Sequence, residues 1–246
     1  GLAAIRAYSE WMPIRDLPTG LFRTFRFGDL LDLVMLDTRL HGRDPQSGRD
    51  AEVANDPDRT LLGRDQTGWL LDALSTSNRD GVRWRVIGQQ VVVSPFELDD
   101  GRFNPDAWDG YRADRKRVFD HLADESIEDV VFLTGDVHSS WAFEVPGDDG
   151  TPRRALEFVC PAITSPPFGK SVEIPKEQMP HLVYHELFHN GYAVVELTPA
   201  AVRLEYAYSE TVKTRTANTI AGPVFEAAAG THRLQRVAGG DPDVRG

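Results

Sequence analysis

The sequence contains a single cysteine, Cys160, among 246 residues, so no disulfide can form within the chain. No apolar run approaches the roughly 18–20 residues of a transmembrane helix, so we expect no membrane-spanning segment. Basic residues are fewer than acidic residues, 27 against 38, and the formal net charge is -11. Because nucleic-acid binding requires a basic patch, this balance argues against unspecific binding to DNA or RNA.

The composition is that of a globular protein, with 41% hydrophobic and 26% charged residues, so a chain of this length can bury the core of one large domain. We find no internal repeat and no signal peptide. Because residue 1 is Gly rather than Met, we expect the chain to be processed or trimmed at this end.

The stretch around which the sequence is organised begins with Val130–Thr134, an apolar run that predicts a buried strand. Gly135 ends this run, and Asp136 and His138 follow, two residues apart. Ligands of α/β enzymes gather at the carboxyl ends of strands, and Asp and His side chains both bind metal ions. An extended backbone would point the two side chains into one crevice, and the segment 139–141 (Ser-Ser-Trp) would form a polar and aromatic rim.

Other readings of these residues stay open. Gly-Asp is also a common turn pair, and a single histidine near a strand end is often a hydrogen-bonded surface residue. Asp136 and His138 would then only brace a loop.

A hairpin is predicted from Leu21 to Leu36, with its turn at Gly28-Asp29, because apolar residues alternate along it. Asp37 and Arg39 follow its second strand, and we favour an Asp–Arg pair that fixes a loop over a direct catalytic role. Helices are predicted from Asp65, as N-cap, to residue 80 and from 111 to 123. Gln89 and Gln90 interrupt an apolar stretch, so at least one of their amides must be hydrogen-bonded inside the protein.

Three histidines spaced four residues apart, His181, His185 and His189, suggest a second chemistry. On a helix they would share one face, and with the neighbouring Glu186 they could bind zinc. Pro180 argues against a long helix at this position. A later hairpin is predicted at 191–198 and 202–208, followed from residue 213 by extended or partly ordered chain.

Taken together, several motifs resemble the PhoD-like family of alkaline phosphatases and phosphodiesterases, which belongs to the calcineurin-like metallophosphatases. The resemblance covers residues 1–210 and leaves 211–246 as an extended C-terminal tail. It rests on Ala7-Tyr8-x-Glu10-Trp11-Met12-Pro13, Leu36-Asp37-Thr38-Arg39, Gln66-x-x-Trp69-Leu70, Trp84-x-Val86-Ile87-Gly88-x-Gln90-Val91, Trp108-Asp109-Gly110-Tyr111, Leu133–Trp141 and Gly191-Tyr192.

The resemblance implies an α/β fold in which helices flank a two-sheet β-sandwich, with a metal cluster at the strand ends. It also implies iron and calcium as cofactors and hydrolysis of small-molecule phosphate esters by a metal-activated hydroxide. Asp136 and His138 match the family's last pair of metal ligands, and we expect them to be catalytic. Arg39 or Arg115 would bind the phosphate. The family also implies a secreted or periplasmic location.

The sequence departs from the family pattern at its beginning, because the family's first metal ligands precede the motif that starts here at Ala7. We therefore expect the C-terminal part of the catalytic domain, able to associate with an upstream N-terminal half. Two alternatives remain: a catalytically silent fragment or binding module, and a zinc hydrolase that uses His181, His185 and His189. The substrate is left open.

Overall fold

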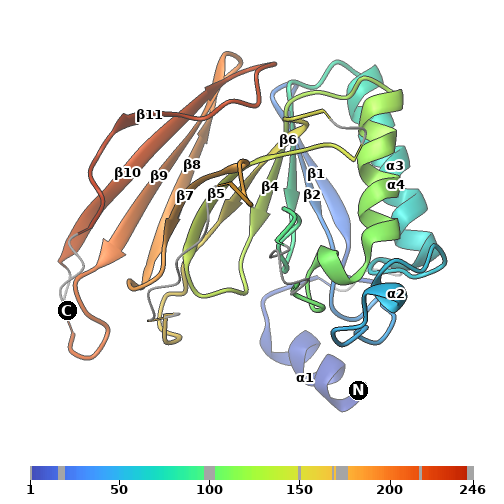
Figure 1. Ribbon diagram of the computed structural model, residues 1–246, viewed down its shortest axis with the longest axis horizontal. Coiled ribbons are helices and arrows are strands. Elements are labelled where there is room, and N and C mark those ends of the chain that lie inside the picture. The colour runs from blue at the N-terminus through green and yellow to red at the C-terminus, as the bar shows by residue number, and fades with distance from the viewer. Residues whose placement is uncertain are drawn as a thin grey trace.

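The computed structural model describes residues 2–15, 20–96, 103–148, 151–167, 169, 177–215 and 218–242. Two β-sheets, of seven and four strands, face each other, and helices α3 (Gly63–Arg79) and α4 (Arg112–Asp124) cover the far face of the larger sheet (Figure 1). This arrangement confirms the α/β fold with a two-sheet sandwich and flanking helices.

The seven-stranded sheet has the order β1-β2-β3-β4-β6-β5-β7. Its strands β2, β3, β4 and β6 run parallel, so their carboxyl ends meet at one edge of the sheet. The remaining pairs are antiparallel. The strands are β1 Arg23–Phe27, β2 Leu31–Met35, β3 Trp84–Gly88, β4 Val130–Thr134, β5 Ser140–Val145, β6 Ala155–Val159 and β7 Leu182–Glu186.

The four-stranded sheet is antiparallel and has the order β11-β10-β9-β8. Its strands are β8 Gly191–Leu197, β9 Ala201–Ser209, β10 Thr219–Ala228 and β11 Gln235–Ala238. The hairpin predicted at 191–208 is confirmed as β8 and β9. The part of the chain that the sequence suggested to be an extended tail contains β10 and β11, and β10 pairs with β9, so it is a component of this sheet.

The described residues also form the helices α1 Leu2–Trp11 and α2 Ala51–Ala54 and the 3-10 turn Trp108–Gly110. Helix α3 begins two residues before Asp65, so the prediction that Asp65 is its N-cap is wrong. Asp65 instead lies in the first turn, where a negative charge is favourable because of the helix dipole.

Two apolar cores hold the layers together. One fills the space between the helices and the seven-stranded sheet, with Leu70, Phe119 and Phe132 among its fully buried members. The other lies between the sheets and includes Trp84, Leu156 and Tyr206. Strand β4 contributes to both cores, which explains why Val130–Thr134 reads as a continuous apolar run.

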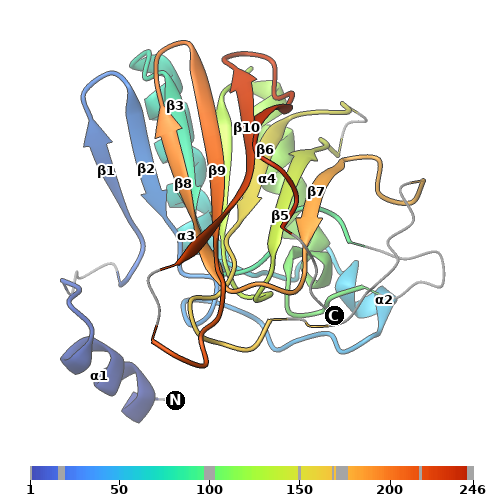
Figure 2. The same ribbon diagram turned by 90° about the vertical axis from the view of Figure 1, so that its left-hand side faces the viewer.

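The smaller sheet does not extend over β1 and β2. In Figure 2 these two strands project beyond the β8 edge of the four-stranded sheet, with α1 below them. Phe25 and Phe27 of β1 are 45% and 55% exposed, although their cross-strand partners Leu33 and Leu31 pack against the core between the sheets. The residues that the structure describes therefore leave the inner apolar face of the sandwich uncovered at this side.

Candidate functional site

The site forms where the parallel strands β2, β3 and β4 end. Their ends are nearly level, because Met35 pairs with Gly88 and Gly88 pairs with Leu133, one residue before the end of β4. Beyond these ends the chain places Arg39 after β2, Gln90 after β3 and Asp136 after β4. Three side chains that are far apart in the sequence thus reach one edge of the sheet, as the sequence predicted for Asp136.

The segment after β4 is a tight turn, so the extended backbone that would point Asp136 and His138 into one crevice is not present. Asp136 and His138 have φ angles of 78° and 53°, which place both in the left-handed region. This conformation costs about 1–3 kcal/mol per non-glycine residue and is found preferentially at functional sites. Because neither residue is a glycine, this conformation was not expected from the sequence.

The ring of His138 is oriented by a backbone carbonyl. Its Nδ1 lies 3.1 Å from the carbonyl oxygen of Pro166, and because a carbonyl oxygen can only accept, Nδ1 carries the proton in this hydrogen bond. In the neutral imidazole, the lone pair is then on Nε2. An exposed histidine held in this way has the arrangement that metal-binding histidines use.

Ser139, Ser140 and Trp141 do not form an exposed rim, because Ser139 and Ser140 are fully buried and Trp141 is 8% exposed. The Ser139 hydroxyl donates to the carbonyl of Val137 at 2.9 Å and accepts from the indole nitrogen of Trp141 at 2.7 Å. These buried hydrogen bonds therefore stabilise the turn that contains Asp136 and His138.

The segment that delivers Arg39 is fixed by two glutamine amides. Gln66 of α3 accepts from the backbone N–H of Asp37 at 2.7 Å and donates to its carbonyl at 2.9 Å. Gln90 accepts from the backbone and hydroxyl of Thr38, both at 2.7 Å, and donates to the carbonyl of residue 36 at 2.9 Å. The prediction that a glutamine after β3 is hydrogen-bonded inside the protein is confirmed.

Asp37 also fixes this segment, but not through a side-chain pair with Arg39. Its carboxylate accepts from the backbone N–H groups of Arg39 and Leu40 at 3.0 and 2.9 Å, which closes a turn directly after β2. The Asp37–Arg39 ion pair predicted from the sequence is therefore wrong, because the guanidinium donates to Asp106 and Asp136, and Asp37 fixes the loop through backbone donors instead. The Arg39 side chain is thereby left available for the site.

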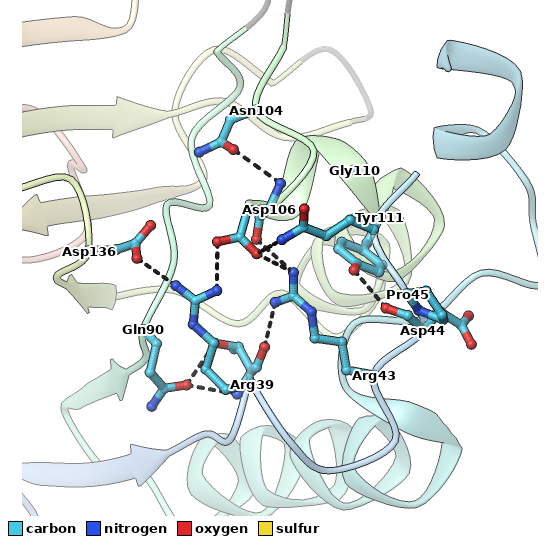
Figure 3. Close-up of polar contacts among 12 residues, drawn as sticks. Arg39, Arg43, Asp44, Pro45, Gln90, Asn104, Asp106, Gly110, Tyr111 and Asp136 are labelled. Atoms are coloured by element: carbon cyan, nitrogen blue, oxygen red, sulfur yellow. Dashed lines mark hydrogen bonds and ion pairs between the residues drawn. The ribbon is translucent and has the colours of Figure 1, made fainter. Parts of the chain in front are cut away.

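Arg39 bridges two carboxylates (Figure 3). One terminal nitrogen of its guanidinium donates to Asp136 at 2.5 Å, and the other donates to Asp106 at 2.6 Å. Asp106 also accepts from Arg43 and from Gln46, each at 2.6 Å. The sequence did not single out Asp106, Arg43 or Gln46, because each lies in a long polar loop and meets its partners only in the folded chain.

A buried carboxylate supports the end of β4. Glu157 of β6 accepts from the hydroxyl of Thr134 at 2.7 Å and from the backbone N–H groups of Val93 and Ser94 at 2.9 and 2.8 Å. Burial raises the pKa of this carboxyl, and the hydrogen bonds offset that effect only in part. Glu157 therefore ties β4 to the segment after β3, immediately before the Gly135-Asp136 turn.

Arg115 of α4 lies in the interior, 5% exposed. Its guanidinium donates to the carbonyls of Val93 and Pro146 and pairs with Asp148, and burial lowers its pKa to about 10. These contacts tie α4 to two loops. A role of Arg115 in substrate binding stays a prediction.

The three spaced histidines do not share a helix, because Leu182–Glu186 forms β7: His185 lies in this strand, His181 directly precedes it and His189 follows it. Four residues span about 13 Å in a strand, so the spacing does not bring the rings together. His181 contacts the carbonyl of Pro95 at 2.9 Å, His185 stacks on Trp141, and His189 contacts Glu186 at 2.8 Å. The zinc site suggested for them is therefore wrong.

Comparison with known proteins places these features in a family. The family model described as PhoD-like phosphatase matches residues 2–206. The chain belongs to the PhoD-like phosphatase family. The family assignment agrees with the resemblance carried by the motifs at residues 7–13, 36–39 and 133–141.

Two relatives show how much of a PhoD-like protein is present. Alkaline phosphatase D of Bacillus subtilis (strain 168) is 34% identical over 225 residues, which cover 83% of this chain and 38% of the relative. A solved structure of PhoD is 31% identical and superposes with a TM-score of 0.85, covering 97% of this chain and 49% of that chain. This chain therefore spans less than half the length of either relative.

The donors at the site fit a metal ion in their chemistry. A carboxylate and an imidazole suit iron, and carboxylate oxygens also suit calcium. Asp136 and His138 are, however, only two donors. Within the described ranges, no group of three or more His, Cys, Asp or Glu side chains is placed to hold a metal.

The structure also has no helix, in the part described, that is long and apolar enough to cross a membrane.

Proposed function

We propose that this chain carries part of the active site of an enzyme that hydrolyses small-molecule phosphate esters with the help of metal ions, iron and calcium being the family expectation. The observation that carries the proposal is the turn after β4, in which Asp136 and His138 both have a left-handed backbone, Asp136 accepts a hydrogen bond from the Arg39 guanidinium, and the ring of His138 is held through its Nδ1 atom. Membership in the PhoD-like phosphatase family supports it.

Each residue has a separate task in this proposal. Asp136 and His138 would hold a metal ion, which would lower the pKa of a bound water and neutralise charge on the phosphoryl oxygens. Arg39, a planar donor with five N–H groups, orients the phosphate for in-line attack. Asp37, Gln66 and Gln90 keep Arg39 in place through the backbone.

The remaining ligands must come from water, substrate or further polypeptide, because two donors do not complete a metal site. We propose that further polypeptide, such as an upstream half of the domain, covers the inner face of β1 and β2 when the enzyme is active. A cavity of about 930 Å³ opens there between α1 and the hairpin, and Ile5, Tyr8, Phe25 and Arg39 are among its lining residues. The cavity thus connects the uncovered apolar face with the site.

By family resemblance we also propose a location outside the cytoplasm.

The test compares Asp136→Asn with the matched control Asp120→Asn. Asp120 lies on the exposed side of α4 and pairs with Lys116, away from the site. Both proteins are prepared as this chain and together with the preceding part of a PhoD-like catalytic domain. Metal content is then measured by elemental mass spectrometry, and turnover with bis(p-nitrophenyl) phosphate.

We expect Asp136→Asn to lose bound metal and to reduce turnover by at least 100-fold, because a neutral amide is a poor ligand for a hard cation. Asp120→Asn should retain both. Full metal content and full turnover in Asp136→Asn would contradict the role of this residue. If both variants turn over the ester as fast as the unsubstituted protein, and this turnover survives removal of metal by a chelator, the proposed function is contradicted.

A further inference from the structure

We infer that Asp106 is the positioning residue that sets Arg39 toward the phosphate, an inference that rests on the function proposed above. Asp106 lies on the connection between β3 and α4, which passes the edge of the sheet where β2, β3 and β4 end. Three side chains donate to its carboxylate, from Arg39, Arg43 and Gln46, each at 2.6 Å (Figure 3). Its own backbone N–H donates to Asn104 at 3.1 Å, which fixes the turn on which it lies.

The two arginines on Asp106 have different roles. Arg43 has a side chain 9% exposed, lies over the Tyr111 ring at 4.9 Å, and donates to the carbonyls of Thr38 and Asp106 as well as to the Asp106 carboxylate. Both terminal nitrogens of Arg43 thus donate within the protein, and three hydrogen bonds hold them. Arg43 stabilises the loop and the position of Asp106.

Arg39 retains donors for a ligand. Its side chain is 36% exposed, and it gives one hydrogen bond to Asp106 and one to Asp136. Its other three N–H groups have no acceptor among the residues that the structure describes. Arg39 is therefore the arginine that can donate to a phosphate oxygen while Asp106 holds it.

Asp106 is ionised at neutral pH. Burial alone would raise the pKa of its carboxyl, but the hydrogen bond and charge of Arg39 and the charge of Arg43 outweigh that effect, and the pKa lies below its ordinary value. Without this carboxylate, Asp136 would be the only acidic partner of Arg39 in the described structure. The guanidinium would then lose one of its two fixed contacts and keep only the one with Asp136.

Positioning and simple electrostatics predict opposite results. Asp106→Asn removes a negative charge from a site for an anion, so electrostatic attraction alone predicts tighter binding of phosphate. If Asp106 acts by positioning Arg39, the same substitution weakens binding of phosphate. The direction of the change therefore decides between the two.

The experiment measures the dissociation constant of inorganic phosphate by calorimetry, and KM and kcat for bis(p-nitrophenyl) phosphate, on the metal-loaded enzyme with its covering polypeptide. The variants are Asp106→Asn, Asp106→Glu, Arg39→Lys and the double variant Asp106→Asn/Arg39→Lys. Asp120→Asn serves as the charge-matched control, since its carboxylate contacts only Lys116 in the described structure. Thermal unfolding of each variant is recorded alongside.

We expect Asp106→Asn to raise the phosphate dissociation constant and KM about tenfold, with a smaller effect on kcat. Asp106→Glu should recover part of the loss. Arg39→Lys should weaken phosphate binding as much as Asp106→Asn does. The double variant should bind phosphate no more weakly than either single variant, because both substitutions remove the same directed guanidinium.

Unchanged or tighter phosphate binding in Asp106→Asn overturns the inference, as does a double variant whose losses multiply. If Asp106→Asn fails to fold, the comparison of Asp106→Glu with Arg39→Lys decides, and a glutamate variant with wild-type affinity and KM contradicts the positioning role. Wild-type enzyme that binds phosphate but cleaves no ester overturns the proposed function alone. Wild-type enzyme that does neither overturns both.

Discussion

Replacing Gln66 by methionine tests how the structure holds Arg39 in place. Gln66 is fully buried, and its amide pairs with both the N–H and the carbonyl of Asp37, which is 6% exposed. Methionine has a similar length but no amide, so two buried backbone groups would lose their partners. An orphaned buried polar group costs about 1–3 kcal/mol, so the free energy of unfolding should fall by about 2–6 kcal/mol.

Urea denaturation measures this loss. With a denaturant slope of about 3 kcal/mol per molar urea, the midpoint should fall by about 0.7–2 M and the slope should stay unchanged. The control is Gln235→Met, because Gln235 is exposed on β11 and a substitution there should change stability by about 0.5 kcal/mol or less. Equal midpoints for the two variants, by both circular dichroism and tryptophan fluorescence, would refute the reasoning that Gln66 holds the segment after β2.

Two further predictions concern parts of the fold away from the strand ends. Phe25→Asp should leave the stability of this chain nearly unchanged, because Phe25 is 45% exposed, but should abolish binding of the preceding part of a PhoD-like catalytic domain supplied as a second chain. Val237→Asp, at a 51% exposed position on β11, should leave this binding intact. Equal binding by both variants in a pull-down assay would contradict the proposal that further polypeptide covers β1 and β2. His232 is buried and its Nε2 accepts from the backbone N–H of Asp129 at 3.0 Å, and burial lowers the pKa of the imidazole more than its acidic neighbours raise it. Because the folded-state pKa is depressed, stability is fully present above the unfolded value of about 6.5 and falls as pH decreases toward the folded pKa, so the urea midpoint should drop between pH 7 and pH 5 and His232→Asn should flatten that drop.

Local patterns were sufficient to predict the elements whose side chains alternate or run continuously apolar. The hairpin of β1 and β2 follows from alternation and the Gly28-Asp29 turn, and β4 follows from its apolar run. Strand β10 was hidden, because it contains Gly222 and Pro223, residues that normally interrupt strands. The structure accommodates both at a register shift between Ala221 and Val224, as a bulge allows.

The site could be predicted only in part, for a related reason. Asp136 and His138 were recognisable from their place after a buried strand, and Arg39 from its place after another. Asp106 gave no signal, because it lies 67 positions from Arg39 in the sequence and no local pattern records their contact. The histidines at 181, 185 and 189 misled for the opposite reason, since a spacing of four has meaning on a helix and the chain there forms β7.

The most direct test of the central claim is an anomalous-diffraction map of the enzyme crystallised with iron, calcium and inorganic phosphate, including whatever polypeptide covers β1 and β2. We predict a metal peak within bonding distance of the Asp136 carboxylate and the His138 Nε2 atom, with phosphate between that metal and the Arg39 guanidinium. A fully occupied metal that contacts neither Asp136 nor His138, or a phosphate bound away from Arg39, would contradict the account.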